Sequence, residues 1–213
     1  MPNLLIIDDH TIIRTGLKMI IQNFLPHSKI DEAEDGDSAF EKIKQNDYDL
    51  LILDVNMPNS DSFGLVSNIL ALKSNSKILM LSMNSEEIYA KRYLKMGAMG
   101  YVQKDAPHDE IKKAITTALN NKRYLSAELS ESLLNDLQGN GNSVNPFDDL
   151  SPRQFEIVQH LVHGESSADI CSKLTLHSST LGTHKARILG KLKCKNILDL
   201  NTLARLHNVI SPS

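Results

Sequence analysis

Hydrophobic and polar positions alternate over residues 1–122 in a regular succession of two kinds of segment. Short, nearly continuous apolar runs such as "DLLILDV" (49–55) are typical of β-strands buried on both faces. Segments such as "TIIRTGLKMIIQNFL" (11–25) repeat apolar residues at helical spacing. Strands are expected at 3–8, 29–34, 49–55, 77–83 and 100–104, and helices at 11–25, 36–46, 61–73, 85–97 and 107–122. Five strand–helix pairs in a row predict an α/β domain with helices on both faces of a parallel sheet.

The pattern changes after residue 122. Residues 123–145 are expected to be a linker that contains a helix at 128–138, because "QGNGNSVNPFDD" (138–149) has no apolar periodicity and is rich in Gly and Asn. Only helical segments follow, at 151–164, 166–174, 178–192 and 196–207. The first of them opens with a capping box formed by Ser151 and Gln154. These short helices predict a small all-α helix-turn-helix domain at 146–213.

The net charge of −3 conceals a difference between the two parts of the chain. Residues 1–145 hold 15 Lys and Arg against 20 Asp and Glu, whereas residues 146–213 hold 8 against 6. The segment "GTHKARILGKLKCK" (182–195) carries five cations and no acid. This charge distribution favours nucleic acid as a partner of the second part. The alternative is a helical protein-binding domain with a solvated basic face.

Other features indicate the cellular setting. No apolar run approaches the length of a membrane span, and "MPNLLIIDDH" (1–10) lacks the basic leader of a signal peptide. Cys171 and Cys194 are not at metal-binding spacing, so neither a disulfide framework nor a zinc site is predicted. We expect a protein of the reducing cytoplasm with no membrane partner.

One carboxylate lies in an unusually apolar setting. Asp54 follows the run "LLIL", where a buried charge is costly unless it is paired. In a doubly wound sheet of the flavodoxin-like order 2-1-3-4-5, ligands bind at the carboxyl ends of the strands. Polar residues expected at those ends are Asp8, Asp9, Asp54, Ser82 and Lys104. The alternative interpretation is that each of them only caps its own strand.

Three clustered carboxylates would repel one another and raise one another's pKa values. A hard divalent cation removes that repulsion, and Mg²⁺ binds one or two carboxylates together with waters and phosphate oxygens. Such a site suits an aspartate that attacks phosphorus, with Lys104 opposing the developing charge. The backbone carbonyl of Asn56 can complete the metal site. A phosphatase of the haloacid-dehalogenase kind is disfavoured, because it would carry a second aspartate at position 56.

The motifs "IIDDH" (6–10), "LLILDVNMP" (50–58), "LMLSM" (79–83) and "GYVQKDA" (100–106) resemble, in order and spacing, those of receiver domains in two-component response regulators. The resemblance covers residues 1–122. It implies that Asp54 is the phosphoacceptor and that Asp9 binds Mg²⁺ directly, with Asp8 acting through a water. It further implies that Ser82 is the switch hydroxyl and that Lys104 is the phosphoryl-stabilising lysine.

Three further positions bear on this resemblance. Tyr101 stands at the switch aromatic position, and the alternative for it is an ordinary surface or half-buried strand tyrosine. Asp61 is followed by Ser62 where receivers often have Asp-Gly, so a different loop shape is expected. The "KDA" sequence that begins at Lys104 fits the branch of response regulators with LuxR-type output domains.

Residues 150–192 resemble the LuxR-type DNA-binding domain of NarL/FixJ regulators, and the match extends over 146–211. The resemblance implies that helix 178–192 enters the major groove. The residues expected to contact DNA are Thr180, Thr183, His184, Lys185, Arg187 and Lys191. Leu181-Gly182 replaces the usual Val-Lys, and glycine costs a helix about 1 kcal/mol relative to alanine. His177 stands where a capping serine is usual, and Ser178 is expected to take over that role.

Together these patterns predict a response regulator transcription factor. A sensor histidine kinase would phosphorylate Asp54, and the sheet would repack near helix 85–97. Homodimerisation and binding to double-stranded DNA would follow. No enzymatic activity beyond slow self-dephosphorylation is expected. The alternative is a phosphorylation-controlled protein-binding regulator whose C-terminal domain has lost DNA binding.

Overall fold

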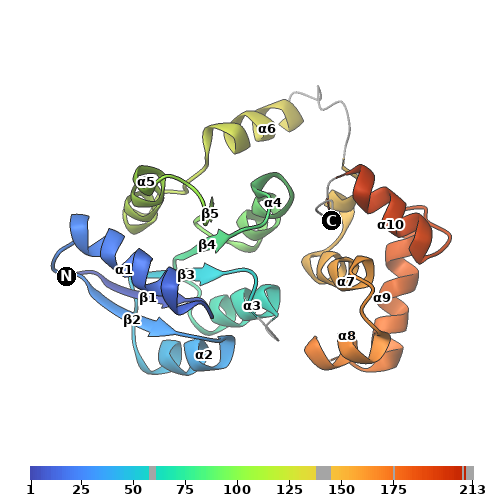
Figure 1. Cartoon of the computed structure of the whole chain (residues 1–213), viewed down its shortest axis with the longest axis horizontal. Helices are drawn as coiled ribbons and strands as arrows, with labels where there is room; N and C mark the ends of the chain where they lie inside the picture. The colour runs from blue at the N-terminus through green and yellow to red at the C-terminus, as the bar shows by residue number, and fades with distance from the viewer. Residues whose placement is uncertain (58–60, 138–144, 175, 208, 210–213) are drawn as a thin grey trace. The chain divides into compact units, whose positions relative to one another are not determined.

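The computed structural model describes residues 1–57, 61–137, 145–174, 176–207 and 209 (Figure 1). Pro58 of the "LLILDVNMP" motif therefore lies outside the described residues. The chain divides into two compact units, residues 1–139 and 140–213.

The first unit is a five-stranded parallel sheet in the order β2-β1-β3-β4-β5, which confirms the predicted fold class. Its strands are β1 (Asn3–Ile7), β2 (Lys29–Ala33), β3 (Leu50–Asp54), β4 (Ile78–Ser82) and β5 (Gly100–Gln103). Its helices are α1 (Thr11–Phe24), α2 (Gly36–Gln45), α3 (Ser62–Leu72), α4 (Glu86–Met96), α5 (His108–Leu119) and α6 (Ala127–Leu137).

Helices cover both faces of this sheet. α1 and α5 pack together on one face, while α2, α3 and α4 follow one another on the other (Figure 1). Every residue of β3 is buried, which is why this strand reads as a continuous apolar run. Leu4 of β1 pairs with Leu50 of β3, and Ile7 pairs with Leu53. This parallel register brings the residues that follow both strands to the same edge of the sheet.

The loop before α3 shows the consequence of Ser62 in place of glycine. Asp61 is the N-cap of α3, and its Oδ1 accepts the backbone N–H of Gly64 at 2.6 Å. The Ser62 side chain is buried, and its Oγ lies 2.7 Å from the hydroxyl of Tyr93 in α4. The serine therefore links the start of α3 to α4.

The second unit consists of a short 3₁₀ helix, η1 (Pro146–Asp149), followed by α7 (Pro152–Val162), α8 (Ser167–Lys173), α9 (Ser178–Lys191) and α10 (Ile197–Leu206). α7 packs against α9 and α10, and α8 packs against α9. The predicted capping box of α7 is present in full. The prediction for the start of α9 is wrong: its N-cap is His177, which makes no side-chain capping bond, and Ser178 is already helical.

Residues 146–149 end the stretch 138–149, which shows no apolar periodicity in the sequence, and they form the 3₁₀ helix η1; residues 138–144 lie outside the described part of the chain. Phe147 in η1 is fully buried. Its ring centroid lies 6.5 Å from that of Phe155 in α7 and 6.2 Å from that of His207. A single apolar side chain in a polar stretch thus anchors this segment in the core of the second unit.

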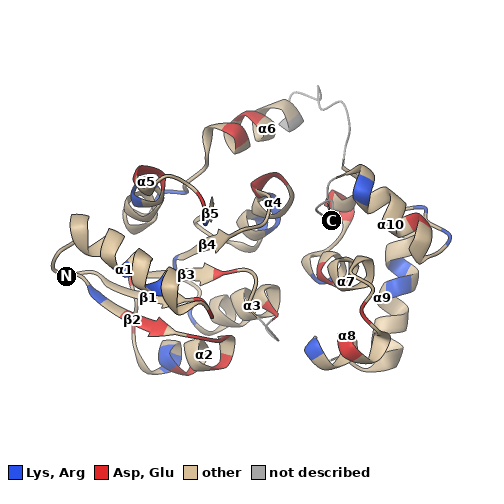
Figure 2. Cartoon of the chain, in the orientation of Figure 1, with Lys and Arg blue, Asp and Glu red and all other residues tan. Residues whose placement is uncertain are grey.

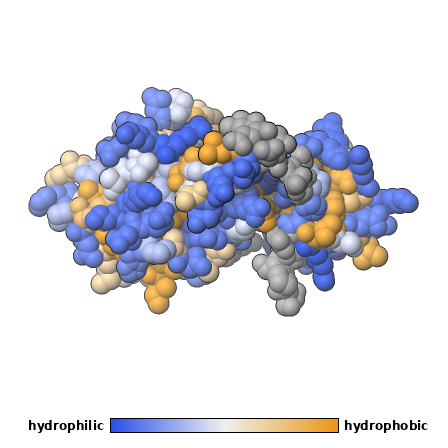
Figure 3. All heavy atoms as spheres, turned by 90° about the horizontal axis from the view of Figure 1, so that it is seen from above, coloured by the Kyte–Doolittle hydropathy of each residue, from blue (hydrophilic) through white to orange (hydrophobic). Residues whose placement is uncertain are grey.

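The face of the molecule seen in Figure 3 is mostly hydrophilic, with scattered apolar patches. Large apolar side chains exposed among the described residues include Ile12, Met19, Met83, Leu198 and Leu206. Within the described ranges, none of the helices combines the length and the apolar character needed to cross a bilayer.

Candidate functional site

The carboxyl ends of β1 and β3 place two buried carboxylates next to one cation. Lys104 follows β5, and its Nζ lies 2.6 Å from Oδ2 of Asp8 and 2.8 Å from Oδ2 of Asp54. The three side chains are at most 6% exposed. A buried ion pair requires good geometry to offset desolvation. Here one ammonium group contacts two carboxylates that would otherwise repel each other.

Electrostatics distinguish Asp54 from an ordinary surface aspartate. Burial raises the pKa of Asp54, and the contact with Lys104 and the backbone N–H of Asn56 (3.1 Å to Oδ1) oppose that rise. Burial lowers the pKa of Lys104, but the two carboxylates outweigh it and leave that pKa raised. Lys104 therefore stays protonated at neutral pH and keeps a positive charge beside Asp54.

Asp9 and His10 complete the cluster on its exposed side. Nδ1 of His10 lies 2.8 Å from Oδ1 of Asp9 and 3.3 Å from Oδ1 of Asp8. Asp8, Asp9, His10 and Asp54 each offer one ligand atom, and these atoms lie within 4.8 Å of one another. Carboxylate oxygens at this separation suit a hard divalent cation. His10 was not among the predicted site residues, although it directly follows the acidic pair in the sequence.

The loop between β4 and α4 forms a hydrogen-bonded network beside this cluster. Ser82 ends β4 and is fully buried; its Oγ accepts the backbone N–H of Asn84 at 3.0 Å. The side-chain amide of Asn84 donates to Oδ1 of Asn56 at 2.8 Å. Tyr101 in β5 donates its hydroxyl to the backbone carbonyl of Asn84 at 3.0 Å. Asn84 thus connects the loop after β3 with both residues predicted to form the switch.

Tyr101 is fully buried, in contrast to the alternative of a surface or half-buried strand tyrosine. Burial raises its pKa, so the phenol remains a hydrogen-bond donor. Its ring stacks with that of Tyr93 at a centroid distance of 6.3 Å, and Tyr93 stacks with Phe63 at 4.5 Å. This aromatic group joins β5 to α3 and α4.

Arg14 supports the cluster from α1, and the sequence offered no signal for it. Its side chain is buried, and one guanidinium nitrogen donates to the backbone carbonyl of Asp8 at 2.7 Å. Its Nε pairs with Glu32 of β2 at 3.1 Å. In the sequence Arg14 looks like an ordinary polar residue of an amphipathic helix. Its partners Asp8 and Glu32 lie outside that helix, so the local pattern does not reveal them.

In the second unit, the residues predicted to contact DNA all lie on α9, which carries several cations (Figure 2). Thr180, Thr183 and Arg187 are exposed, whereas His184 and Lys185 are half-buried. Burial lowers the pKa of His184, as do the charges of Arg153 and Arg187, so this imidazole is neutral at pH 7.

Two of the predicted cations already have partners within the unit. Nζ of Lys185 donates to the hydroxyl of Ser167 at 2.8 Å, which joins α9 to α8. Nζ of Lys191 donates to the backbone carbonyl of Asp149 at 2.8 Å and to Oε1 of Gln154 at 3.0 Å. Lys191 therefore also braces the capping box of α7.

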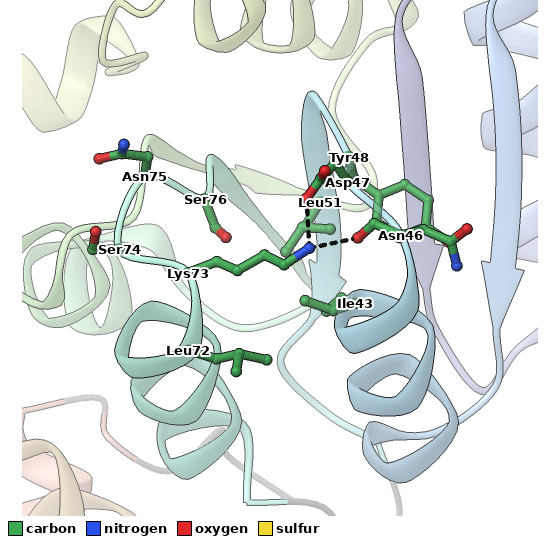
Figure 4. Close-up of a pocket in the computed structure, with 10 residues that line it drawn as sticks. All are labelled: Ile43, Asn46, Asp47, Tyr48, Leu51, Leu72, Lys73, Ser74, Asn75 and Ser76. Carbon is green, nitrogen blue, oxygen red and sulfur yellow. Dashed lines mark hydrogen bonds and ion pairs between the residues drawn. The ribbon is translucent and has the colours of Figure 1, made fainter.

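A separate pocket of about 390 Å³ lies between the ends of α2 and α3 (Figure 4). Lys73 reaches across it, with Nζ 2.8 Å from the carbonyl of Asn46 and 2.6 Å from Oδ1 of Asp47. The pocket borders the loops that lead into β3 and β4, at the opposite end of these strands from Asp54. Its only lysine is occupied by these contacts, so we assign no binding role to it.

Two family models match this arrangement of domains. The response regulator receiver domain matches residues 4–116, which is more than half of the chain, and the luxR family of bacterial regulatory proteins matches residues 148–204. The chain therefore belongs to the two-component response regulators that join a receiver domain to a LuxR-type DNA-binding domain. This confirms the resemblance seen in the sequence.

Curated relatives agree over nearly the whole length. The chain is 34% identical to the oxygen regulatory protein NreC of Staphylococcus carnosus (strain TM300) over 200 residues, which cover 91% of this chain and 92% of that protein. The same identity and coverage hold for NreC of Staphylococcus aureus (strain JH9).

Solved structures of RcsB from Salmonella enterica serovar Typhimurium share the fold. One, bound to the promoter rprA in the presence of the phosphomimetic BeF₃⁻, superimposes with a TM-score of 0.72 at 22% identity, covering 96% of this chain and 99% of RcsB. Another RcsB structure gives a TM-score of 0.75 at 23% identity and covers 96% and 98%.

Proposed function

We propose that Asp54 accepts a phosphoryl group from a phosphohistidine of a sensor histidine kinase. The observation that carries this proposal is the buried Asp54 carboxylate at the end of β3, 2.8 Å from the ammonium group of Lys104. In the transfer, an Asp54 oxygen bonds to phosphorus as the phosphorus–nitrogen bond of the donor breaks. The bonding electrons remain on the imidazole, and Asp54 becomes an acyl phosphate.

The surrounding residues have separate roles in this transfer. Lys104 places a fixed positive charge where the equatorial oxygens of the phosphoryl group become more negative. The Ser82 hydroxyl, which now accepts from the N–H of Asn84, can turn to donate to a phosphoryl oxygen. No turnover of an external substrate is part of this function, beyond slow hydrolysis of the protein's own acyl phosphate.

The cluster also fits Mg²⁺, because its donors are carboxylate oxygens grouped within 4.8 Å. Asp9, Asp54 and the backbone carbonyl of Asn56 would hold the ion, and Asp8 would act through a water. When bound, Mg²⁺ supplies positive charge that offsets the charge of the carboxylates and of the phosphate oxygens.

We further propose that phosphorylation controls dimerisation and the binding of α9 to double-stranded DNA. Support comes from the luxR-family match and from RcsB, which has been seen as dimers bound to DNA. A symmetric dimer would contact two half-sites about one helical turn apart. Binding to chromosomal DNA would place the protein in the cytoplasm. The rival proposal, a protein-binding regulator without DNA contact, has no observation in its favour.

Intact mass spectrometry tests the acceptor. Wild-type protein incubated with acetyl phosphate and Mg²⁺ should gain one phosphoryl group, and Asp54→Asn should gain none. Asp49→Asn is the matched control, because Asp49 lies just before the opposite end of β3 and its side chain accepts a hydrogen bond from the backbone N–H of Asn3. Phosphorylation of the Asp54→Asn protein would refute the assignment.

A salt titration of duplex binding tests the output. If cations of α9 contact phosphates, log affinity should fall linearly with log salt by counterion release. Arg187→Gln should reduce that slope by about 0.9, the value for one lost phosphate contact. Arg205→Gln, which removes an exposed cation from α10, is the control and should leave the slope unchanged. Lack of duplex affinity at low salt would instead favour the protein-binding alternative.

A further inference from the structure

The chain that leads from α5 to α6 is fixed to the receiver domain. The backbone N–H of Tyr124 donates to the carbonyl of Met99 at 2.7 Å, and the Tyr124 side chain is 3% exposed. Its hydroxyl bonds to the carboxylate of Glu110 in α5. A Cβ atom at Gly100 would lie 2.9 Å from the carbonyl oxygen of Tyr124, so glycine permits this close approach. Residue 124, predicted to belong to the linker, is therefore part of the receiver core.

One hydroxyl then joins α6 to α4. Ser126 is 9% exposed, and its Oγ accepts the backbone N–H of Leu129 at 3.0 Å, which caps the first turn of α6. The same Oγ donates to Oε2 of Glu86 at 2.7 Å, in the first turn of α4. Leu129 is 2% exposed, and α6 packs against α4. The start of α6 is thus joined to the start of α4 by a hydrogen bond, and the two helices pack together.

Burying the Glu86 carboxylate in this contact costs free energy. Burial raises the pKa of Glu86, and the nearby charges of Glu128 and Glu110 raise it further, while Ser126 opposes them. The second oxygen, Oε1, is buried and has no hydrogen-bond partner among the described residues. A buried carboxylate that is half satisfied loses free energy relative to one in water. The cost of burying Oε1 without a partner therefore offsets part of the stabilisation that the Glu86–Ser126 hydrogen bond contributes.

The phosphorylation site is connected to Glu86 through the β4–α4 loop. The Ser82 hydroxyl accepts a hydrogen bond from the N–H of Asn84, and the Tyr101 hydroxyl donates one to the carbonyl of Asn84. If the Ser82 hydroxyl turns to a phosphoryl group on Asp54, its bond to Asn84 is lost. That loss removes one of the three hydrogen bonds that hold Asn84, two residues before Glu86 in the first turn of α4. A contiguous set of contacts thus links the acceptor to the contact with α6.

From these contacts we infer that the Glu86–Ser126 hydrogen bond, which joins the start of α6 to α4, is the latch that phosphorylation of Asp54 opens. Opening frees the helix that precedes the DNA-binding domain. The inference rests on the proposed acceptor role of Asp54. It goes beyond that role by naming the contact through which the signal leaves the receiver domain.

Hydrogen–deuterium exchange of the full-length chain tests the latch, with beryllofluoride and Mg²⁺ as the phosphoryl mimic. In wild type, the mimic should speed exchange in peptides from 127–135. Glu86→Ala removes the acceptor of Ser126 but leaves the cap of Leu129 in place. It should speed exchange in α6 roughly fivefold without the mimic, the factor for one lost hydrogen bond of about 1 kcal/mol. The mimic should then add little.

Glu87→Ala is the matched control, because Glu87 lies in the same turn of α4 and is exposed. It should behave as wild type. The latch is refuted if Glu86→Ala exchanges in α6 at the wild-type rate, or if the bound mimic alters residues 82–89 but leaves α6 unchanged. Fluorine NMR of bound beryllofluoride separates the two proposals. No binding at all would overturn both the acceptor role and the latch, whereas binding without a response in α6 overturns the latch alone.

Discussion

Two glycines in the second unit should respond to the same substitution with opposite signs. Gly182 lies inside α9, and Gly164 follows α7 with φ of +77°. A Cβ atom built at either position meets no atom within 4 Å. Gly182→Ala and Gly164→Ala therefore differ only in the backbone conformation that the new side chain must accept. The new methyl group should make no packing contact in either variant.

The expected magnitudes follow from this difference. Alanine is about 0.8–1.0 kcal/mol more favourable than glycine inside a helix, so Gly182→Ala should stabilise the second unit by that amount. For a domain of about 60–100 residues this corresponds to a rise in Tm of roughly 4–8 °C. At Gly164 alanine must adopt the left-handed region, which costs about 1–2 kcal/mol, so Tm should fall by at least as much.

Circular dichroism at 222 nm measures the unfolding of both units, and tyrosine absorbance provides an internal control. All five tyrosines lie between residues 48 and 124, so their signal reports only on the receiver unit. It should unfold at the same temperature in wild type and in both variants. A lower Tm for Gly182→Ala, or shifts of the same sign for both variants, would refute the conclusion that the fold does not require glycine at position 182.

Three further changes test other contacts. Lys104→Met leaves two buried carboxylates without their cation, so it should destabilise the receiver unit by about 3 kcal/mol; an unchanged tyrosine-monitored transition would contradict the ion pairs. Ser151→Ala removes the cap of α7 and should cost about 1 kcal/mol, seen as a lower Tm by circular dichroism. Burial raises the pKa of Glu165, but Lys173 and His160 outweigh it and lower that pKa overall, so its ionised form stabilises the fold above the ordinary carboxyl pKa. Glu165→Gln should therefore lower Tm at about pH 7 and have less effect at about pH 3, below the ordinary carboxyl pKa; an equal effect at both values would contradict this.

Local patterns accounted for most of the secondary structure. All five predicted strands are present, and each predicted helix contains the observed one or differs from it by one residue at each end. Gly97 ends α4 in the left-handed conformation, which glycine adopts without the steric cost that a Cβ atom would bring. These features depend on residues within a few positions of one another, so they can be read directly from the sequence. The order of the strands came from the flavodoxin-like fold class and not from these local patterns.

The failures have an equally physical cause. Phe147 lies in a polar stretch without apolar periodicity, yet its ring packs against those of Phe155 in α7 and His207 at the end of α10. Ser178 was expected to be the N-cap of α9, but it is already the first helical residue, and His177 is the N-cap. Tyr124 was placed in the linker, although its backbone pairs with Met99. In each case the deciding partner is absent from the local pattern.

The sequence by itself determined which segments are strands and helices, and it identified the acidic and hydroxyl residues of the receiver motifs. Periodicity and capping act over a few residues, so the order of amino acids is enough to specify them. Only the tertiary structure decided which side chains meet: Lys104 between Asp8 and Asp54, Arg14 beneath Asp8, and Ser126 on Glu86. Such pairs join atoms from different elements, and their contact depends on strand register and on how the helices pack against the sheet.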